Sequence, residues 1–145
     1  MATSLSSLRR NIVRSAVLPT PRFRYSPVVE AGPFVFISGL VGLDPFSGSL
    51  AAGGAYGQTK QIISNFMALC QEQNWEIADL LVARVYCGAG VDAASVNMAW
   101  DEAFVDADPP ARTFVVVTAL PLGATVEIEF QLLRDEKTRS TPELS

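Results

Sequence analysis

Histidine is absent from this chain of 145 residues, and only two cysteines and two lysines occur in it. Without histidine, neither a Ser-His-Asp triad nor an imidazole metal site can form. Cys70 and Cys87 stand in apolar segments without metal-like spacing, so we expect buried free thiols in a reducing compartment, the cytoplasm. Lys60 and Lys137 lie in polar surroundings, which disfavours a Schiff base. Carboxylates, arginine, tyrosine, hydroxyls and water must therefore carry any chemistry, with no metal and no other cofactor.

Long apolar runs are also missing. No stretch approaches the roughly 18 residues that a membrane span needs, so we expect no membrane partner. The formal charge is −4, and no basic, aromatic-rich surface is evident, which argues against a nucleic-acid partner. Residues 1–24 nevertheless hold five arginines and no acid. Such a start is typical of a mitochondrial transit segment, but we favour a solvated arm because strand-like sequence already begins near Asn11.

The composition that is present, with 49% hydrophobic residues, predicts one domain with a substantial core. We expect a flexible lead over residues 1–8, a single domain over 9–134 and a polar tail over 135–145. A hairpin followed by strand, helix, strand, helix, strand and strand predicts an α+β domain with both helices on one face of a sheet. The main predicted strands are 11–18, 34–37, 79–87, 113–120 and 124–133, and the predicted helices are 55–73 and, capped by Asp92, 93–105.

The last two predicted strands carry the two most informative charges. Segment 113–120 is apolar on both faces, as in a strand covered on both sides, whereas 124–133 alternates. Arg112 precedes the first strand and Glu127 lies near the start of the second. Because the strands run in opposite directions, roughly 15 Å should separate these charges within one copy. Either they serve separate purposes, or they meet across a subunit boundary, where a half-apolar open sheet face would associate with another copy.

Several motifs in this order resemble the RidA/YjgF family of imine and enamine deaminases, from about Asn11 to Arg134. The most specific are Pro110-Ala111-Arg112, Leu120-Pro121 and Val126-Glu127-Ile128. Supporting matches are Tyr25-Ser26, Ile37-Ser38-Gly39, Asp44-Pro45 with Gly48, the pattern Gln58/Gln61/Asn65, and Asn97.

The resemblance implies a chorismate-mutase-like mixed sheet and a homotrimer with its sites in clefts between subunits. It implies that Arg112 clamps a substrate carboxylate through two parallel hydrogen bonds, and that Glu127 positions and deprotonates the attacking water. Other residues would shape the pocket. By the same resemblance, the substrate is a small reactive 2-imino or 2-enamino acid, which is hydrolysed to a 2-oxo acid and ammonia. The implied substrate-binding residues are Tyr25, Gly39, Asn97 and Phe114.

Departures from the family pattern leave the substrate open. Leu40 stands where glutamine is common and Phe114 where cysteine is frequent, which predicts a bulkier, more apolar pocket if both point inward. A deaminase for a larger unsaturated amino acid is one alternative, and a non-catalytic trimer that senses small carboxylates such as 2-oxo acids is another. RNA cleavage, attached to some relatives, is disfavoured by the charge and the missing histidine. Outside the motif, Arg112 would be a surface ion-pair partner and Glu127 a solvated strand residue.

Overall fold

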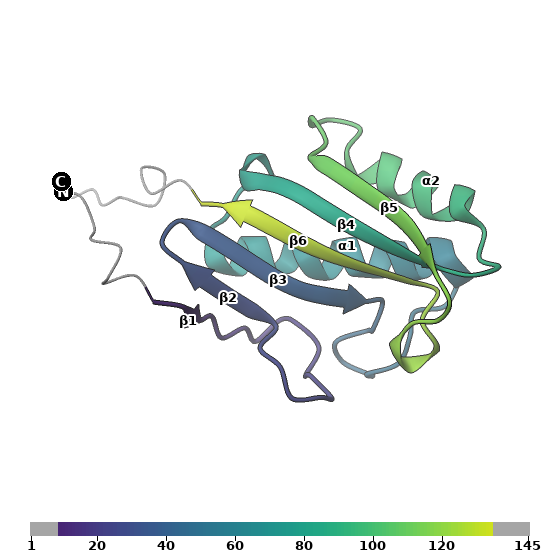
Figure 1. Cartoon of the computed structure of the whole chain (residues 1–145), viewed down its shortest axis with the longest axis horizontal. Helices are drawn as coiled ribbons and strands as arrows, with labels where there is room; N and C mark the ends of the chain where they lie inside the picture. Colours follow the sequence, from purple (N-terminus) through teal and green to yellow (C-terminus); the bar gives the residue numbers. More distant parts are fainter. Residues whose placement is uncertain (1–8, 135–145) are drawn as a thin grey trace.

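The computed structural model describes residues 9–134, which form one six-stranded sheet with two helices (Figure 1). The predictions for residues 1–8 and 135–145 lie outside the described residues. Neither helix in the described part is long and apolar enough to cross a membrane. The elements are β1 Asn11–Ile12, β2 Val28–Ala31, β3 Phe34–Val41, α1 Gly54–Gln73, the 3-10 turn η2 Ile77–Asp79, β4 Leu80–Gly88, α2 Ala93–Ala103, β5 Ala111–Val117, the 3-10 turn η3 Pro121–Gly123, and β6 Val126–Leu133.

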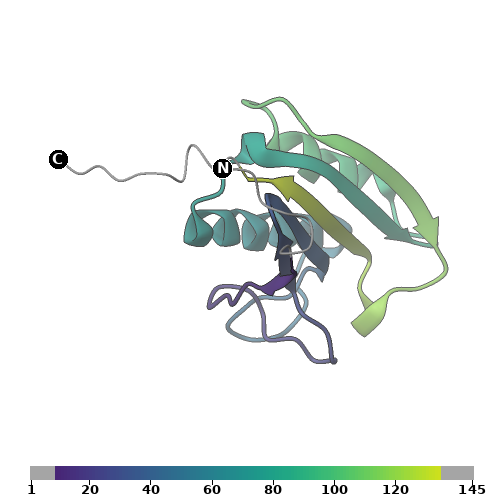
Figure 2. The same cartoon turned by 60° about the vertical axis from the view of Figure 1, so that its left-hand side comes forward.

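The sheet has the strand order β1-β2-β3-β6-β4-β5. Strand β6 lies in the middle and runs antiparallel to both of its neighbours, whereas β5 pairs in parallel with β4. A parallel pair needs a crossover connection, and α2 supplies it between β4 and β5. Strands β5 and β6 therefore flank β4 and do not pair directly. Both helices lie on the same side of the sheet (Figures 1 and 2), which confirms the predicted α+β architecture.

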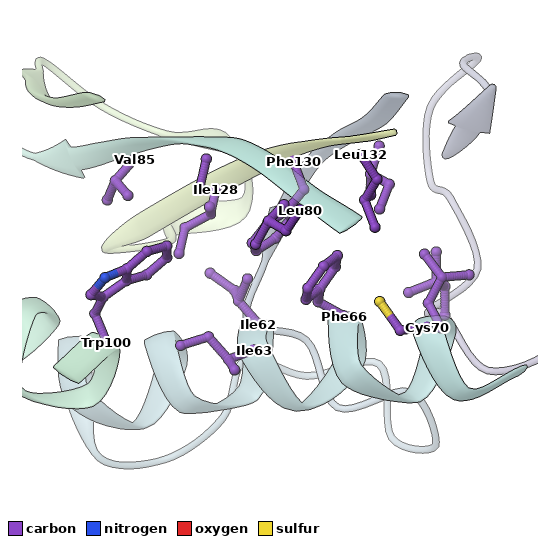
Figure 3. Packing of buried hydrophobic residues seen from close by; sticks show 14 of the residues in the cluster. Ile62, Ile63, Phe66, Cys70, Leu80, Val85, Trp100, Ile128, Phe130 and Leu132 are labelled. Carbon is purple, nitrogen blue, oxygen red and sulfur yellow. The ribbon is translucent and has the colours of Figure 1, made fainter. Parts of the chain in front are cut away.

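The core fills the space between α1 and the sheet. Phe66 of α1 stacks on Phe130 of β6, with ring centroids 4.1 Å apart, and Figure 3 shows Ile62 pointing from the same helix toward the sheet. Two buried polar residues of α1 hold loops instead of filling the core. The Asn65 amide donates to the Leu43 carbonyl at 2.9 Å, and the Gln58 carbonyl accepts from the backbone and hydroxyl of Thr125.

Helix α2 begins as predicted. The Asp92 carboxylate accepts a hydrogen bond from the backbone N–H of Ala94 at 3.1 Å, which satisfies a free donor of the first turn. The helix ends at Ala103, two residues before the predicted end, and an irregular segment leads into Pro109-Pro110. The residue before a proline is disfavoured in helical conformation.

Three strand predictions need correction. The strand predicted over 11–18 extends only over β1, because side chains satisfy the N–H groups beyond it: Glu72 accepts from Ala16, and the Ser15 hydroxyl accepts from residues 17 and 18. Strand β3 continues to Val41 through a bulge, past its predicted end. Strand β5 is not covered on both sides in a single chain, since it is the edge strand and Val116 is 65% exposed.

Candidate active site

Glu127 lies on the sheet face that the helices leave open. Its neighbours across the sheet are Val41 of β3 and Tyr86 of β4. The side chain borders a cavity of about 350 Å³ that Tyr25 and Gly39 also line. Within residues 9–134 its carboxylate accepts no hydrogen bond, and burial raises its pKa, to which the negative charge of Glu129 adds. A half-buried carboxylate with a raised pKa is a suitable general base.

Gly39 provides the space for that carboxylate. It lies in the bulge of β3, where the pairing with β6 shifts by one residue. A Cβ atom at this position would lie 2.0 Å from Oε2 of Glu127 and 2.8 Å from its Cδ. These separations are far below van der Waals contact, so only glycine lets the carboxylate take its observed place. The β-bulge and the glycine together position Glu127 in the cavity.

Tyr25 comes from the long segment between β1 and β2 and reaches the same cavity. Burial raises the pKa of its hydroxyl, and the negative charge of Glu127 raises it further. The hydroxyl therefore stays protonated at neutral pH and is available as a hydrogen-bond donor next to a carboxylate.

A second pair of side chains beside Glu127 was not predicted as part of the site. The hydroxyl of Tyr86 donates a hydrogen bond to Oε1 of Glu129. This bond raises the pKa of Tyr86. It also holds in place the negative charge of Glu129, which adds to the raised pKa of Glu127. The sequence signal that could have found this pair is the alternation of residues 82, 84 and 86 in β4. It becomes informative only once the register between β4 and β6 is known.

Arg112 forms a separate group with residues of α2. Its Nη1 donates to Oδ1 of Asn97 at 2.9 Å, and its guanidinium lies 5.2 Å from the ring centre of Trp100 and 5.4 Å from that of Phe114. Aromatic faces attract a guanidinium at such distances. No carboxylate within residues 9–134 forms an ion pair with Arg112. The guanidinium is held in place, and its other N–H groups can bind an anion.

The strand register separates these two groups. Arg112 pairs with Ala83 of β4, whereas Glu127 pairs with Tyr86 from the other side of the same strand. Three residues along β4 and two strand spacings across the sheet amount to about 14 Å. Ala83 and Tyr86 also point to opposite faces, since one is buried under the helices and the other lies on the open face. Arg112 and Glu127 of one chain therefore do not meet, as expected.

The six predicted site residues thus fall into two sets of three. Tyr25, Gly39 and Glu127 share the cavity, and Asn97, Arg112 and Phe114 share the edge of the sheet beside α2. The two departures from the family pattern divide in the same way: Leu40 borders the cavity while packing on the core, and Phe114 lies against Arg112. No group of three side chains able to hold a metal ion exists within residues 9–134.

A family model described as Endoribonuclease L-PSP matches residues 15–132. The chain belongs to this family, in which the RidA/YjgF proteins are found. The family resemblance inferred from the motifs is therefore confirmed.

Named relatives agree. The chain is 34% identical over 125 residues to the 2-iminobutanoate/2-iminopropanoate deaminase of Capra hircus, covering 86% of this chain and 90% of that one. It is 31% identical over 120 residues to a RutC family protein of Pyrococcus horikoshii, covering 83% and 94%. Among solved structures, RidA from an Antarctic Psychrobacter matches with a TM-score of 0.77 and 31% identity, covering 85% of this chain and 98% of that one.

A further solved relative holds a small molecule. Escherichia coli TdcF with bound serine is 25% identical to this RidA-family chain, with a TM-score of 0.79 and coverage of 86% and 99%.

Proposed function

We propose that this RidA-family protein hydrolyses reactive 2-imino and 2-enamino acids to 2-oxo acids and ammonia, in clefts between the copies of a homotrimer. The observation that carries the proposal is the division of the site. Glu127 with Tyr25 supplies a base and a donor, and Arg112 with Asn97 supplies an anion clamp, but the two halves lie on different faces of one chain. A second copy that brings its Arg112 to the cavity completes the site.

The open sheet face supports such an assembly. Four of its apolar side chains are between 40% and 45% exposed, two on β3, one on β5 and one at the end of β6. Phe34 pairs with Leu133 and lies beside Phe36 on this face, and an exposed apolar patch of this kind marks an interaction site. The edge strand β5 is apolar on both faces, as suits a strand that another copy covers. The four side chains are Phe34, Phe36, Val115 and Leu133.

The chemistry needs only these groups. Arg112 holds the substrate carboxylate, which places the adjacent C=N carbon beside Glu127. As a water oxygen bonds to that carbon, Glu127 takes a proton from the water, and the C=N electron pair moves to the protonated nitrogen. Glu127 then returns the proton to the amino nitrogen. The C–N bond breaks, ammonia leaves, and the hydroxyl gives its proton to the Glu127 carboxylate as it becomes the C=O group of the 2-oxo acid. Glu127 then passes this proton to the departing ammonia and is a carboxylate again.

Location and partners follow from the side-chain inventory. Both cysteines are free and buried, and burial raises the pKa of Cys70 to about 12. Buried free thiols of this kind are typical of proteins in a reducing compartment, so we propose the cytoplasm as the location of this protein. With a formal charge of −4, a small carboxylate substrate fits the molecule better than a nucleic acid does.

The proposal is tested by generating imines in solution. An amino-acid oxidase or a threonine dehydratase supplies the imine, semicarbazide traps what is not hydrolysed, and added protein should lower the trapped fraction. Arg112→Ala should abolish that effect, while alanine in place of the exposed Arg10 should leave it unchanged. Equal activity of wild type and Arg112→Ala would overturn the proposal.

A second candidate function is the binding of 2-oxo acids without turnover. The apolar walls around Glu127 favour it, since they leave few groups for proton transfer. This function predicts thermal stabilisation by 2-oxo acids that depends on Arg112, no ammonia release, and no chemical effect of Glu127→Gln.

A further inference from the structure

The cavity beside Glu127 is lined mostly by apolar residues. Two of the polar side chains that border it bind the backbone: the Ser38 hydroxyl donates to the Ser26 carbonyl at 2.8 Å, and Nη2 of Arg22 donates to the Gly48 carbonyl. Among the residues that border the cavity, Glu127 and Tyr25 carry the carboxylate and hydroxyl that the proposed chemistry uses, and Thr20 adds a further hydroxyl. Most of the remaining wall comes from leucine, valine, proline and phenylalanine side chains.

Two loop residues make the mouth of this cavity more apolar than the fold requires. Phe23 is 63% exposed and Leu122 is 37% exposed, and both border the cavity. Leu122 has a φ of 62° and a ψ of 18°, within the left-handed region that a leucine rarely adopts. Strained residues of this kind cluster at ligand sites, where the surrounding structure holds them. The backbone of η3 thus presents a leucine side chain to the cavity in a strained conformation.

The reacting carbon of a 2-imino acid has three substituents. Under the proposed function, the carboxylate goes to Arg112 of a second copy and the nitrogen stays near Glu127, so the side chain is left for the remaining wall. That wall is mostly apolar, and the cavity volume of about 350 Å³ is within the range of small-molecule pockets. A methyl group would leave most of the apolar wall in contact with water.

We propose that this cavity binds the side chain of the substrate and selects 2-imino acids with large apolar side chains, such as those derived from leucine, methionine or phenylalanine, over the imine derived from alanine. Phe23 and Leu122 are its specificity-determining residues. The inference rests on the proposed function and specifies its substrate class. Each further methylene buried in such a wall strengthens binding by about four-fold, so the leucine-derived imine should exceed the alanine-derived imine in kcat/KM by at least about ten-fold.

The test compares the two imines, each generated in solution and trapped with semicarbazide, with the full-length protein in its native assembly. Leu122→Asn is the most informative variant. Asparagine tolerates the left-handed conformation better than leucine does, so the fold should be kept while the apolar side chain is lost. The ratio of kcat/KM for the leucine-derived over the alanine-derived imine should fall about ten-fold. An unchanged ratio, or a wild-type preference for the alanine-derived imine, would overturn the inference.

Two phenylalanines give a matched pair of variants. Phe23→Ala should lower the same ratio, whereas Phe46→Ala should leave it unchanged, because Phe46 is 98% exposed on a loop outside this cavity. A thermal shift with 4-methyl-2-oxopentanoate, compared with pyruvate, measures side-chain selection without turnover. Selective binding without hydrolysis would support the selective cavity and contradict the deaminase function. Hydrolysis without side-chain preference would support the deaminase function and contradict the selective cavity.

Discussion

Substitution of Gly39 by alanine tests how Glu127 is positioned. The new Cβ would lie 2.0 Å from Oε2, 2.8 Å from Cδ and 3.0 Å from Cγ of Glu127. Because the closest atom is the end of a flexible side chain, the carboxylate should move away by about 1 Å or more and the strand should stay in place. A misplacement of about 1 Å in a catalytic group can cost on the order of 100-fold in rate. We therefore expect Gly39→Ala to lower kcat about 100-fold, with a small change in melting temperature.

The assay is imine hydrolysis measured by semicarbazide trapping, with thermal melts of each variant. Gly88→Ala is the control, since a Cβ at this other strand glycine meets nothing closer than Val91 Cγ2 at 3.3 Å. The double variant Gly39→Ala, Glu127→Gln shows whether Gly39→Ala acts through Glu127, because two changes that act through one group are not additive. It should be no slower than Glu127→Gln alone. Wild-type activity in Gly39→Ala would refute the positioning argument, as would additive losses in the double variant.

Two further predictions concern the two halves of the site. Glu127 acts in its ionised form and its pKa is raised, so kcat/KM should fall with decreasing pH, starting above the pKa of ~4.3 of an ordinary glutamate. Because Glu129→Gln removes a negative charge that raises this pKa, the fall should move to lower pH in that variant. A pH profile unchanged in the variant would contradict this prediction. Asn97→Ala removes one hydrogen bond to Arg112, worth about 1 kcal/mol. Steady-state kinetics should therefore show KM raised about five-fold and kcat changed less. A loss confined to kcat would count against the role of Arg112 in binding the substrate carboxylate.

Much of the architecture could be predicted because local patterns agree with the fold. The alternation of β6 follows its position between α1 and an open face, and the Asp92 cap places the start of α2. The separation of Arg112 from Glu127 followed from strand direction alone. These features depend on neighbours in the sequence and on the geometry of strands, which the residue types report directly.

Other features depend on contacts that a sequence does not report. The apolar strand β5 was expected to be covered on both faces, but strand order in one chain puts it at the edge. The short β1 reflects the distant Glu72, which takes a backbone N–H that a strand would have used. The pairing of Tyr86 with Glu129 and the left-handed Leu122 depend on register and backbone geometry.

The most direct test of a shared site uses two inactive variants together. Arg112→Ala and Glu127→Gln each remove one half of the site. If neighbouring copies contribute one half each to a cleft, random assembly of the two chains in equal amounts leaves both halves intact in one quarter of the clefts. Co-expressed and purified as mixed assemblies, they should show about one quarter of the wild-type activity in imine hydrolysis. Mixed assemblies no more active than either variant alone would contradict the account.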